Sequence, residues 1–367
     1  MSKILISGYY GFNNIGDEAI LKSIIDQIKH IDKNADIVVL SSNPAFTSKT
    51  YNVRAIKRTN VFKIISEMMS ADLVISGGGS LLQDITSKRS IIYYLSIINI
   101  AIMLNKKVAI YGQGIGPVNC IDNRNRVKKV LNKVDFINVR DKDSKDELIS
   151  MGVNKDINVT VDSVFGMDKP DLDISQHIIS SMNIQDSNKI VGISVRPWKN
   201  RDKIIVQEIS NVCKYLVEKY KYEIILIPFH FESDINIINQ ITTSLDENTK
   251  KKVHTLNKNI SVHEYISLVG NLKFLIGMRL HALIFATLMN IPVIGLSYDP
   301  KIDTFLSMLG KKNAISVLEI TSQDVIKEID DMVENYENIL QDVNEKCENI
   351  LKLSNQNRDI LMKLLKK

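Results

Sequence analysis

Short apolar runs alternate with longer stretches of helical periodicity along most of the chain. The apolar runs are rich in Ile, Val and Leu, and they fall at 3–7, 36–40, 72–76, 107–112, 136–140, 189–195, 223–229, 273–277 and 292–297. The helical patterns lie between them, at 17–30, 90–104, 123–133, 203–219, 234–245 and 281–289. Strands that alternate with helices of about ten or more residues are typical of βαβ units, in which successive strands are parallel. The pattern therefore predicts an α/β fold.

A polar segment at 168–188, which contains Pro170 and no strand pattern, separates two series of this alternation. Domains usually have about 100–200 residues, so a chain of 367 residues is long enough for two. We predict two Rossmann-like, doubly wound domains that face a cleft, at 1–172 and 173–321. A charge-rich helical tail follows at 322–367, and the sequence leaves open whether it packs back on the first domain.

The composition excludes several classes of protein. Hydrophobic residues make up 44% and charged residues 24%, as in ordinary globular proteins, and disorder is excluded. The net charge of +5 is too small to indicate a nucleic-acid partner, which usually requires a strongly basic surface. The three cysteines are far apart and form no C-x-x-C, so neither a disulfide framework nor a metal site is expected. A reducing, cytoplasmic location fits best.

The longest apolar stretch, at 91–104, has 14 residues and includes Ser96 and Asn99. A helix that spans a membrane needs about 20 apolar residues, so we predict a buried core helix. No signal-peptide pattern is expected either, because a polar, Gly-rich segment follows soon after Lys3. Basic residues flank the apolar stretch and leave peripheral contact with the cytoplasmic membrane face as a second interpretation. They are Lys88, Arg89, Lys106 and Lys107.

The loop after the first strand carries the first group of candidate residues. Ligands of open parallel sheets bind beyond the carboxyl ends of the strands. The glycines in GYYGFNNIGDEAI fit neither the dinucleotide nor the phosphate-loop spacing. Asn13 and Asn14 are natural partners for sugar hydroxyls. Asp17 and Glu18 either cap the next helix or orient and deprotonate a hydroxyl.

Two further Gly-rich loops follow strands of the first half. GGGSLLQD, which contains Gly78 and Gly79, allows the backbone to approach a ligand closely, although a tight turn alone would also explain it. GQGIGP is predicted to be an open loop in which Gln113 is a donor and acceptor. Arg140 ends the strand at 136–140 and forms either a strand-end salt bridge with Asp141 or part of the site.

The strand ends of the second half are cationic. They carry Arg196 beside Trp198, then His230, then Arg279 and His281, then Asp299 and Lys301. A cation at a helix N-terminus opposes the helix dipole, whereas an anion bound there is stabilised. The Arg-Leu-His element therefore favours binding of a carboxylate or phosphate, with His281 as a general acid or base. The other interpretation is a core histidine beside a solvated arginine.

Neutral, Gly- and Asn-rich strand ends in one half suit a polyhydroxy acceptor, and cationic strand ends in the other suit a small anionic donor. At these residues the sequence resembles the polysaccharide pyruvyl transferase family, in particular its bacterial members of secondary cell wall polymer synthesis. The matching stretches are SGYYGFNNIGDEAIL, VISGGGSLLQD, YGQGIGP, VRDKDS, GISVRPW, GMRLHALIFA and GLSYDPKID. The resemblance implies a fold like that of the GT-B glycosyltransferases.

The resemblance also implies phosphoenolpyruvate as co-substrate. Neither another cofactor nor a metal is expected, because the cations already meet the charge of this donor and the sequence contains no cluster of metal-ligand residues. The resemblance implies as acceptor a lipid-linked saccharide, whose N-acetylmannosamine residue would receive a 4,6-linked pyruvate ketal. The family places the donor on Arg196, Arg279, Leu280, His281 and Lys301, and its Val-Arg-Asp match falls on Arg140. On this basis His281 is the candidate proton donor, and Asp17 is a candidate base. The oligomeric state stays open.

Two other functions fit parts of the pattern. A nucleotide-sugar glycosyltransferase of the same fold would use paired glutamates, and Glu337 and Glu345 have a suitable spacing. Both lie in the tail helix beyond the last strand, where a solvated face is the simpler explanation. A non-catalytic glycan- or anion-binding protein is the other alternative, but such a protein has less need of a titratable histidine beside its arginine.

Overall fold

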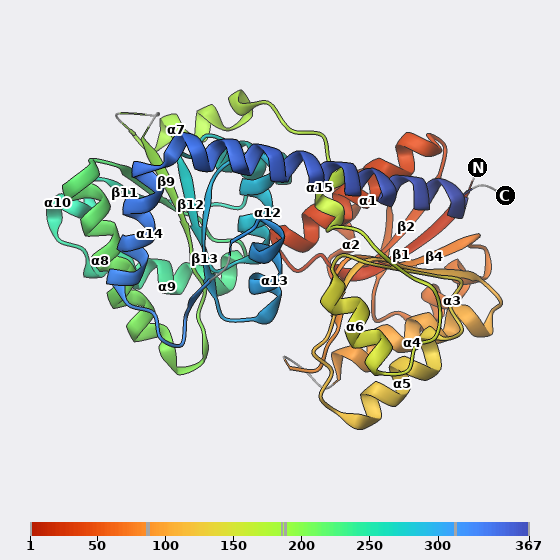
Figure 1. Ribbon diagram of the computed structural model, residues 1–367. Coiled ribbons are helices and arrows are strands. Elements are labelled where there is room, and N and C mark those ends of the chain that lie inside the picture. Colours follow the sequence, from red (N-terminus) through yellow and green to blue (C-terminus); the bar gives the residue numbers. More distant parts are fainter. Residues whose placement is uncertain (1, 86–88, 185, 187–188, 312–313, 366–367) are drawn as a thin grey trace. The chain divides into compact units, whose positions relative to one another are not determined.

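The computed structural model describes residues 2–85, 89–184, 186, 189–311 and 314–365. The chain forms two compact units (Figure 1). Unit 1 comprises Met1–Met167 together with Ile350–Lys367, and unit 2 comprises Asp168–Asn349.

Unit 1 is built on a parallel sheet, which has eight strands within the described residues. Seven strands follow the order β3-β2-β1-β4-β6-β7-β8, and β5 pairs with β6. Their bounds are β1 Lys3–Tyr10, β2 Asp36–Ser41, β3 Arg54–Lys57, β4 Leu73–Ser76, β5 Gly79–Leu82, β6 Lys107–Ile115, β7 Phe136–Val139 and β8 Ile157–Val159. Because the chain adds β2 and β3 on one side of β1 and then β4 on the other, the strand order reverses between β1 and β4.

Helices cover both faces of this sheet (Figure 1). They are α1 Ile15–Ile31, α2 Pro44–Tyr51, α3 Val61–Met69, α4 Ser90–Met103, α5 Ile121–Leu131 and α6 Lys142–Ser150. Alternate strand residues such as Val108 and Ile110 pack with α3, α4 and α5 in one core cluster. Tyr111 points to the other face, where its hydroxyl donates to Gln27 of α1 over 3.0 Å. This period of two is what a sheet covered on both faces requires.

Unit 2 repeats the plan with six parallel strands in its described part, in the order β11-β10-β9-β12-β13-β14. The strands are β9 Ile190–Ser194, β10 Glu223–Leu226, β11 Val253–Thr255, β12 Phe274–Gly277, β13 Val293–Ser297 and β14 Ile315–Ser316. The helices are α7 Gln176–Ser181, α8 Asp202–Tyr220, α9 Phe231–Ser244, α10 Glu247–Lys250, α11 Val262–Gly270, α12 Leu280–Leu288, α13 Pro300–Met308 and α14 Ser322–Glu334. The core cluster on one face joins α8, α9 and α14 to the sheet.

The last helix, α15 (Tyr336–Leu365), is shared between the units. Its residues up to 349 belong to unit 2, and those from 350 onward belong to unit 1. In unit 1 the buried Asn357 bonds both to the Thr160 hydroxyl and to the Val161 carbonyl. The end of a helix that the sequence describes only as a tail is therefore part of the core of unit 1.

The predicted fold class is confirmed, and each predicted strand and helix is present within a few residues of its expected bounds. The sequence missed short elements, among them β3, β5, β8 and β11, because three or four residues carry too little periodicity. The prediction of loops is wrong for two of the Gly-rich segments, because each contains part of a strand. β5 begins at Gly79, and Gln113 lies inside β6, because pairing with β5 and β7 extends that strand to Ile115.

The apolar stretch at 91–104 forms α4, and the prediction of a core helix is confirmed. Ile91, Leu95 and Ile98 are buried in the main cluster of unit 1. None of the helices within the described ranges is long and apolar enough to cross a membrane.

Candidate functional site

In unit 2 the strand order reverses between β9 and β12, and the carboxyl ends of these two strands carry the cations that the sequence singled out. Arg196 lies two residues beyond β9, and Arg279 lies two residues beyond β12. In open α/β sheets such a reversal creates the crevice in which ligands bind. The candidate donor site is therefore at the position that the topology favours.

Arg196 is held by aromatic rings rather than by acids. Its Nη1 donates to the Tyr298 hydroxyl over 3.0 Å, and its guanidinium carbon lies 4.8 Å from the Tyr298 ring centroid and 5.6 Å from that of Trp198. The two rings pack on each other at 4.6 Å. Within the described part of the chain no carboxylate pairs with Arg196. Its positive charge therefore stays uncompensated at the strand ends.

Arg279 precedes α12 and turns its side chain toward Asp234 in the first turn of α9. Nε donates to Asp234 Oδ2 over 3.1 Å, and Nη2 contacts Asp234 Oδ1 and donates to the Ser233 hydroxyl. Asp234 is fully buried and also accepts from the backbone N–H groups of Phe229 and His230. The carboxylate therefore fixes one edge of the guanidinium, while Nη1 makes no hydrogen bond among the described residues.

His230, which the sequence predicts at a strand end and in the cleft, belongs to this network. Its backbone N–H donates to Asp234 over 3.0 Å, and its side chain is half-buried. Burial lowers the pKa of His230 below its usual 6.5, and the positive charge of Arg279 lowers it further. The imidazole Nδ1 is buried without a hydrogen-bond partner among the described residues. A neutral imidazole therefore lies next to Arg279 in unit 2.

His281 and Leu280 form the first turn of α12, directly after Arg279. Leu280 is buried, and His281 is half-buried with its Nε2 atom inside the protein. Arg279 makes no side-chain capping bond to this helix, because a guanidinium has only donors and cannot accept from the N–H groups of a helix start. The Arg-Leu-His element is thus a helix start whose arginine points to another helix.

Lys301 lies in the first turn of α13, at the carboxyl end of β13. Its Nζ is 3.1 Å from Asp299 Oδ2 and 5.8 Å from the Tyr298 ring centroid. Asp299 also caps α13 through the Lys301 N–H. Tyr298 therefore lies between Arg196 and Lys301, a position that the sequence pattern did not reveal.

In unit 1 the loop after β1 has mainly structural contacts. Asn14 caps α1 by accepting from Gly16 N, and Asn13 is exposed with a positive φ of 58°. Glu18 is buried, accepts from Gly11 N over 2.7 Å and from the Tyr51 hydroxyl over 2.6 Å. Burial raises the pKa of Glu18. Glu18 thus holds the loop, beyond simple capping of the helix.

Asp17 lies against the Gly-rich segment at the end of β4. A Cβ at Gly79, where φ is +87°, would stand 2.8 Å from Asp17 Oδ1. Only glycine fits this position, since the backbone is left-handed and the carboxylate occupies the space of a side chain. Gly78 and Gly79 are both buried. The glycines therefore bring the backbone close to a carboxylate at the strand reversal of unit 1.

Arg140 and Gln113 stabilise neighbouring strand ends. Arg140 is buried and pairs with Asp162 Oδ2 at 3.1 Å and with Asp141 Oδ2 at 3.4 Å, so the predicted salt bridge is present. These two carboxylates keep the pKa of Arg140 raised despite its burial. Gln113 is fully buried and donates from Nε2 to Ser76 Oγ and to the Gly77 carbonyl.

Four buried polar atoms near the same strand ends have no hydrogen-bond partner among the described residues, and only Gln113 of these four residues was a candidate from the sequence. They are Ser7 Oγ, Tyr10 Oη, Gln113 Oε1 and Ser163 Oγ. Buried polar groups are almost always satisfied, often by ordered water. This part of unit 1 is therefore polar enough to hold water or ligand hydroxyls.

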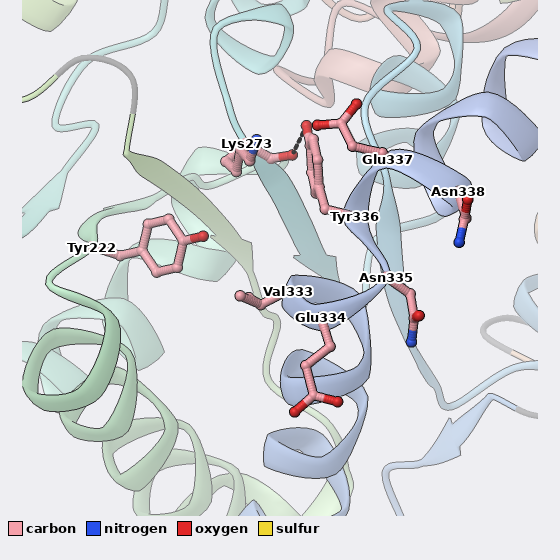
Figure 2. Close-up of a pocket in the computed structure, with 8 residues that line it drawn as sticks. All are labelled: Tyr222, Lys273, Val333, Glu334, Asn335, Tyr336, Glu337 and Asn338. Carbon is pink, nitrogen blue, oxygen red and sulfur yellow. Dashed lines mark hydrogen bonds between the residues drawn. The ribbon is translucent and has the colours of Figure 1, made fainter.

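A pocket of about 300 Å³ lies elsewhere in unit 2, by the amino ends of β10 and β12. Figure 2 shows Tyr336 and Lys273 in it, where the Tyr336 hydroxyl donates to the Lys273 carbonyl over 3.1 Å. The Lys273 Nζ lies 3.3 Å from the Tyr336 ring centroid. Glu337 lines this pocket, but the residues predicted for donor and acceptor do not. Across the described ranges no three His, Cys, Asp or Glu side chains gather in a way that could hold a metal ion.

Comparison with known families decides which proteins this chain is related to. A family model described as polysaccharide pyruvyl transferase matches residues 14–300, which is well over half of the chain. The chain belongs to the polysaccharide pyruvyl transferase family. The matched range contains Asp17, Arg196, Arg279 and His281, whereas Asn13 and Lys301 lie one residue outside it.

Individual relatives agree with the family and the fold. The amylovoran biosynthesis protein AmsJ of Erwinia amylovora is 23% identical over an alignment of 398 residues. The alignment covers 93% of this chain and 94% of that protein. Among solved structures, a co-structure of S. aureus MnaA with UDP has a TM-score of 0.66 at 11% identity, covering 94% of this chain and 91% of that one. A glycosyltransferase from Rickettsia africae has a TM-score of 0.63 at 12% identity, covering 100% and 99%. This member of the pyruvyl transferase family therefore has a GT-B-type fold.

Proposed function

We propose that this transferase moves pyruvate from phosphoenolpyruvate to a sugar of a lipid-linked cell-wall glycan precursor and releases phosphate. The acceptor sugar in this proposal is N-acetylmannosamine, which would become a 4,6-linked pyruvate ketal. The observation that supports it best is Arg196, a cation without a carboxylate partner in the described chain, at the strand reversal of unit 2. An uncompensated guanidinium at this edge favours a small, strongly anionic ligand.

The donor would be held by three cationic side chains, which have different neighbours. Arg196 and the Nη1 of Arg279 would bind carboxylate and phosphate oxygens, with Lys301 as a third cation. A hydrogen bond to Asp234 orients Arg279, and a hydrogen bond to Tyr298 orients Arg196. Preorganised cations of this kind stabilise charge that develops on a leaving phosphate. Leu280 would fill the apolar side of the site beneath the helix start.

The chemistry follows from the structure of phosphoenolpyruvate. A proton from His281 to the methylene carbon makes the enol carbon electrophilic, and a sugar hydroxyl forms the first C–O bond there. The bond to phosphate then breaks, and a second hydroxyl closes the ketal. Of the two hydroxyl protons, one restores His281 and the other leaves with phosphate. Asp17, Asn13 and Asn14 would orient the acceptor hydroxyls at the strand reversal of unit 1.

A GT-B-type nucleotide-sugar glycosyltransferase is the second candidate, since MnaA of the same fold is seen with UDP. Against it stands the position of Glu337 at the amino ends of the strands, away from the arginines. A non-catalytic glycan- or anion-binding protein is the third candidate. Isothermal titration with UDP and with phosphoenolpyruvate separates the first two functions, and phosphate release that depends on an acceptor excludes simple binding.

The direct test is a panel of lipid-linked and soluble saccharide acceptors incubated with phosphoenolpyruvate and analysed by mass spectrometry. The expected result is a pyruvyl mass increment on an N-acetylmannosamine-containing acceptor together with released phosphate. Tight binding of UDP with no pyruvyl increment on any acceptor would refute the proposal.

In this proposal His281 supplies the proton that phosphoenolpyruvate receives. Replacement His281→Ala is expected to lower turnover by about 10²–10⁴-fold, the usual contribution of a general acid, while phosphoenolpyruvate still binds. The measurement is acceptor-dependent phosphate release at saturating donor. His177→Ala, at an exposed position of α7, is the control that should keep full turnover. Near-normal turnover of His281→Ala would show that another group supplies the proton.

A further inference from the structure

The first turn of α3 in unit 1 exposes two apolar side chains to solvent. Phe62 is 89% exposed and Val61 is 55% exposed, whereas Ile64 and Met68 of the same helix are buried in the core. The helix therefore does not need Val61 or Phe62 for its packing. Single exposed apolar residues are common, so the surroundings decide whether this pair has a role.

Basic residues lie close to this pair in the sequence. Lys57, Arg58 and Lys63 lie within a few residues of it, and the segment 55–66 contains no acidic residue. The next acid, Glu67, is already paired with Lys3 and with Arg54. No carboxylate pairs with the three basic residues in the described part of the chain. We call Lys57, Arg58, Val61, Phe62 and Lys63 the α3 patch.

Aromatic contacts fix the patch to the rest of unit 1. The guanidinium of Arg58 lies 4.2 Å from the Tyr93 ring centroid, 5.4 Å from that of Tyr94 and 5.1 Å from that of Phe12. The Tyr93 hydroxyl donates to the Arg58 carbonyl over 2.9 Å. Phe12 belongs to the loop between β1 and α1, the loop that also contains Asn13. The α3 patch is thus in contact, through Arg58, with the candidate acceptor loop.

We propose that the α3 patch docks this chain onto an anionic phospholipid bilayer. Exposed aromatic and β-branched side chains insert at the boundary between headgroups and acyl chains, and nearby lysines attract anionic headgroups. Because the segment 55–66 has three basic residues and no acidic one, it should bind an anionic surface more tightly than a neutral one. The contact is assigned to α3 rather than to the apolar helix α4, because most apolar side chains of α4 pack in the core, although Ile92 and Met103 are exposed. Both helices are on one face of the sheet (Figure 1).

Docking would bring the loop between β1 and α1 close to a saccharide that is anchored in the same bilayer. This consequence rests on the proposed function, but the docking itself does not. Vesicle binding is therefore measured separately from pyruvyl transfer, and transfer is measured with a soluble acceptor.

The test is co-sedimentation of the full chain with vesicles made of equal parts phosphatidylglycerol and phosphatidylcholine. Two double variants probe the apolar and the charged part, Val61→Ser with Phe62→Ser and Lys57→Gln with Lys63→Gln. Each is expected to lower the apparent vesicle affinity about 10-fold or more, and raised salt should weaken binding of the unaltered chain. Ile121→Ser is the matched control, because Ile121 is the first residue of α5 and is 67% exposed.

Three results would overturn the proposal: no binding to these vesicles, equal binding to pure phosphatidylcholine, or equal losses for Ile121→Ser and the patch variants. Light scattering that shows a dimer broken by Val61→Ser with Phe62→Ser would assign the patch to a second copy of the chain instead. Vesicle binding without pyruvyl transfer would leave docking standing and refute only the proposed function. Transfer to a soluble acceptor without vesicle binding would do the reverse.

Discussion

At the scale of single residues, the candidate site depends on what holds each cation. Arg279 is bound by a buried carboxylate, that of Asp234. Arg196, by contrast, contacts the Tyr298 hydroxyl and the rings of Tyr298 and Trp198. A carboxylate compensates the charge that it orients, but a neutral hydroxyl does not. Arg196 should therefore contribute the larger share of anion binding, and Arg279 the larger share of positional accuracy.

Replacement Tyr298→Phe is expected to weaken phosphoenolpyruvate binding about 2- to 12-fold, the value of one net hydrogen bond of about 0.5–1.5 kcal/mol. The ring remains packed on Trp198, so stability should be nearly unchanged. The measurement is isothermal titration of phosphoenolpyruvate. Tyr220→Phe is the control, because that hydroxyl bonds to Asp330 on the surface. Equal affinities for Tyr298→Phe and the control would contradict a positioning role.

At the scale of elements, the end of α15 completes a unit that is mostly built from the first half of the chain. Asn357 is fully buried, accepts from the Thr160 hydroxyl over 2.6 Å and donates to the Val161 carbonyl over 3.0 Å. Thr160 also accepts from Asn138 of β7 over 2.8 Å. This buried chain of hydrogen bonds ties the last helix to the sheet edge of unit 1.

Replacement Asn357→Ala should lower the free energy of unfolding by about 1–3 kcal/mol, because Thr160 and Val161 lose buried partners. Urea denaturation followed by circular dichroism measures the change. Asn355→Ala, at an exposed position of the same helix, should have little effect. If both variants unfold at the same urea concentration, the end of α15 does not stabilise unit 1.

At the scale of the whole molecule, His230 makes stability depend on pH. Its pKa is lowered in the folded chain, so the unfolded chain binds more protons once the pH falls below 6.5. Stability is full above that value and decreases as the pH falls toward the lower pKa of the folded state. Burial is the first cause and the charge of Arg279 is the second, with Asp234 and Glu232 acting in the opposite direction.

His230→Gln is therefore expected to reduce the fall in melting temperature between about pH 8 and pH 5.5, because glutamine does not titrate. Thermal unfolding at a series of pH values gives the comparison. His30→Gln, at an exposed position near the end of α1, is the control. A fall in melting temperature that is unchanged in His230→Gln would show that other groups set the acid sensitivity.

The sequence by itself determined the order of strands and helices, the α/β class and the segments where chemistry is concentrated. These features depend on local periodicity and on glycine and charge patterns, which short stretches of chain express directly. Arg196, Arg279 and His281 could be selected for the same reason, since each directly follows a strand or opens a helix.

Only the tertiary structure decided which groups meet. Arg279 pairs with Asp234 and Arg196 with Tyr298 because crossovers bring separate strands of a parallel sheet together at one edge. Gln113 is buried because β6 gains pairing partners on two sides. The end of α15 belongs to unit 1, although it is far in sequence from the other residues of that unit. Such contacts join residues distant in sequence, and local patterns carry no information about them.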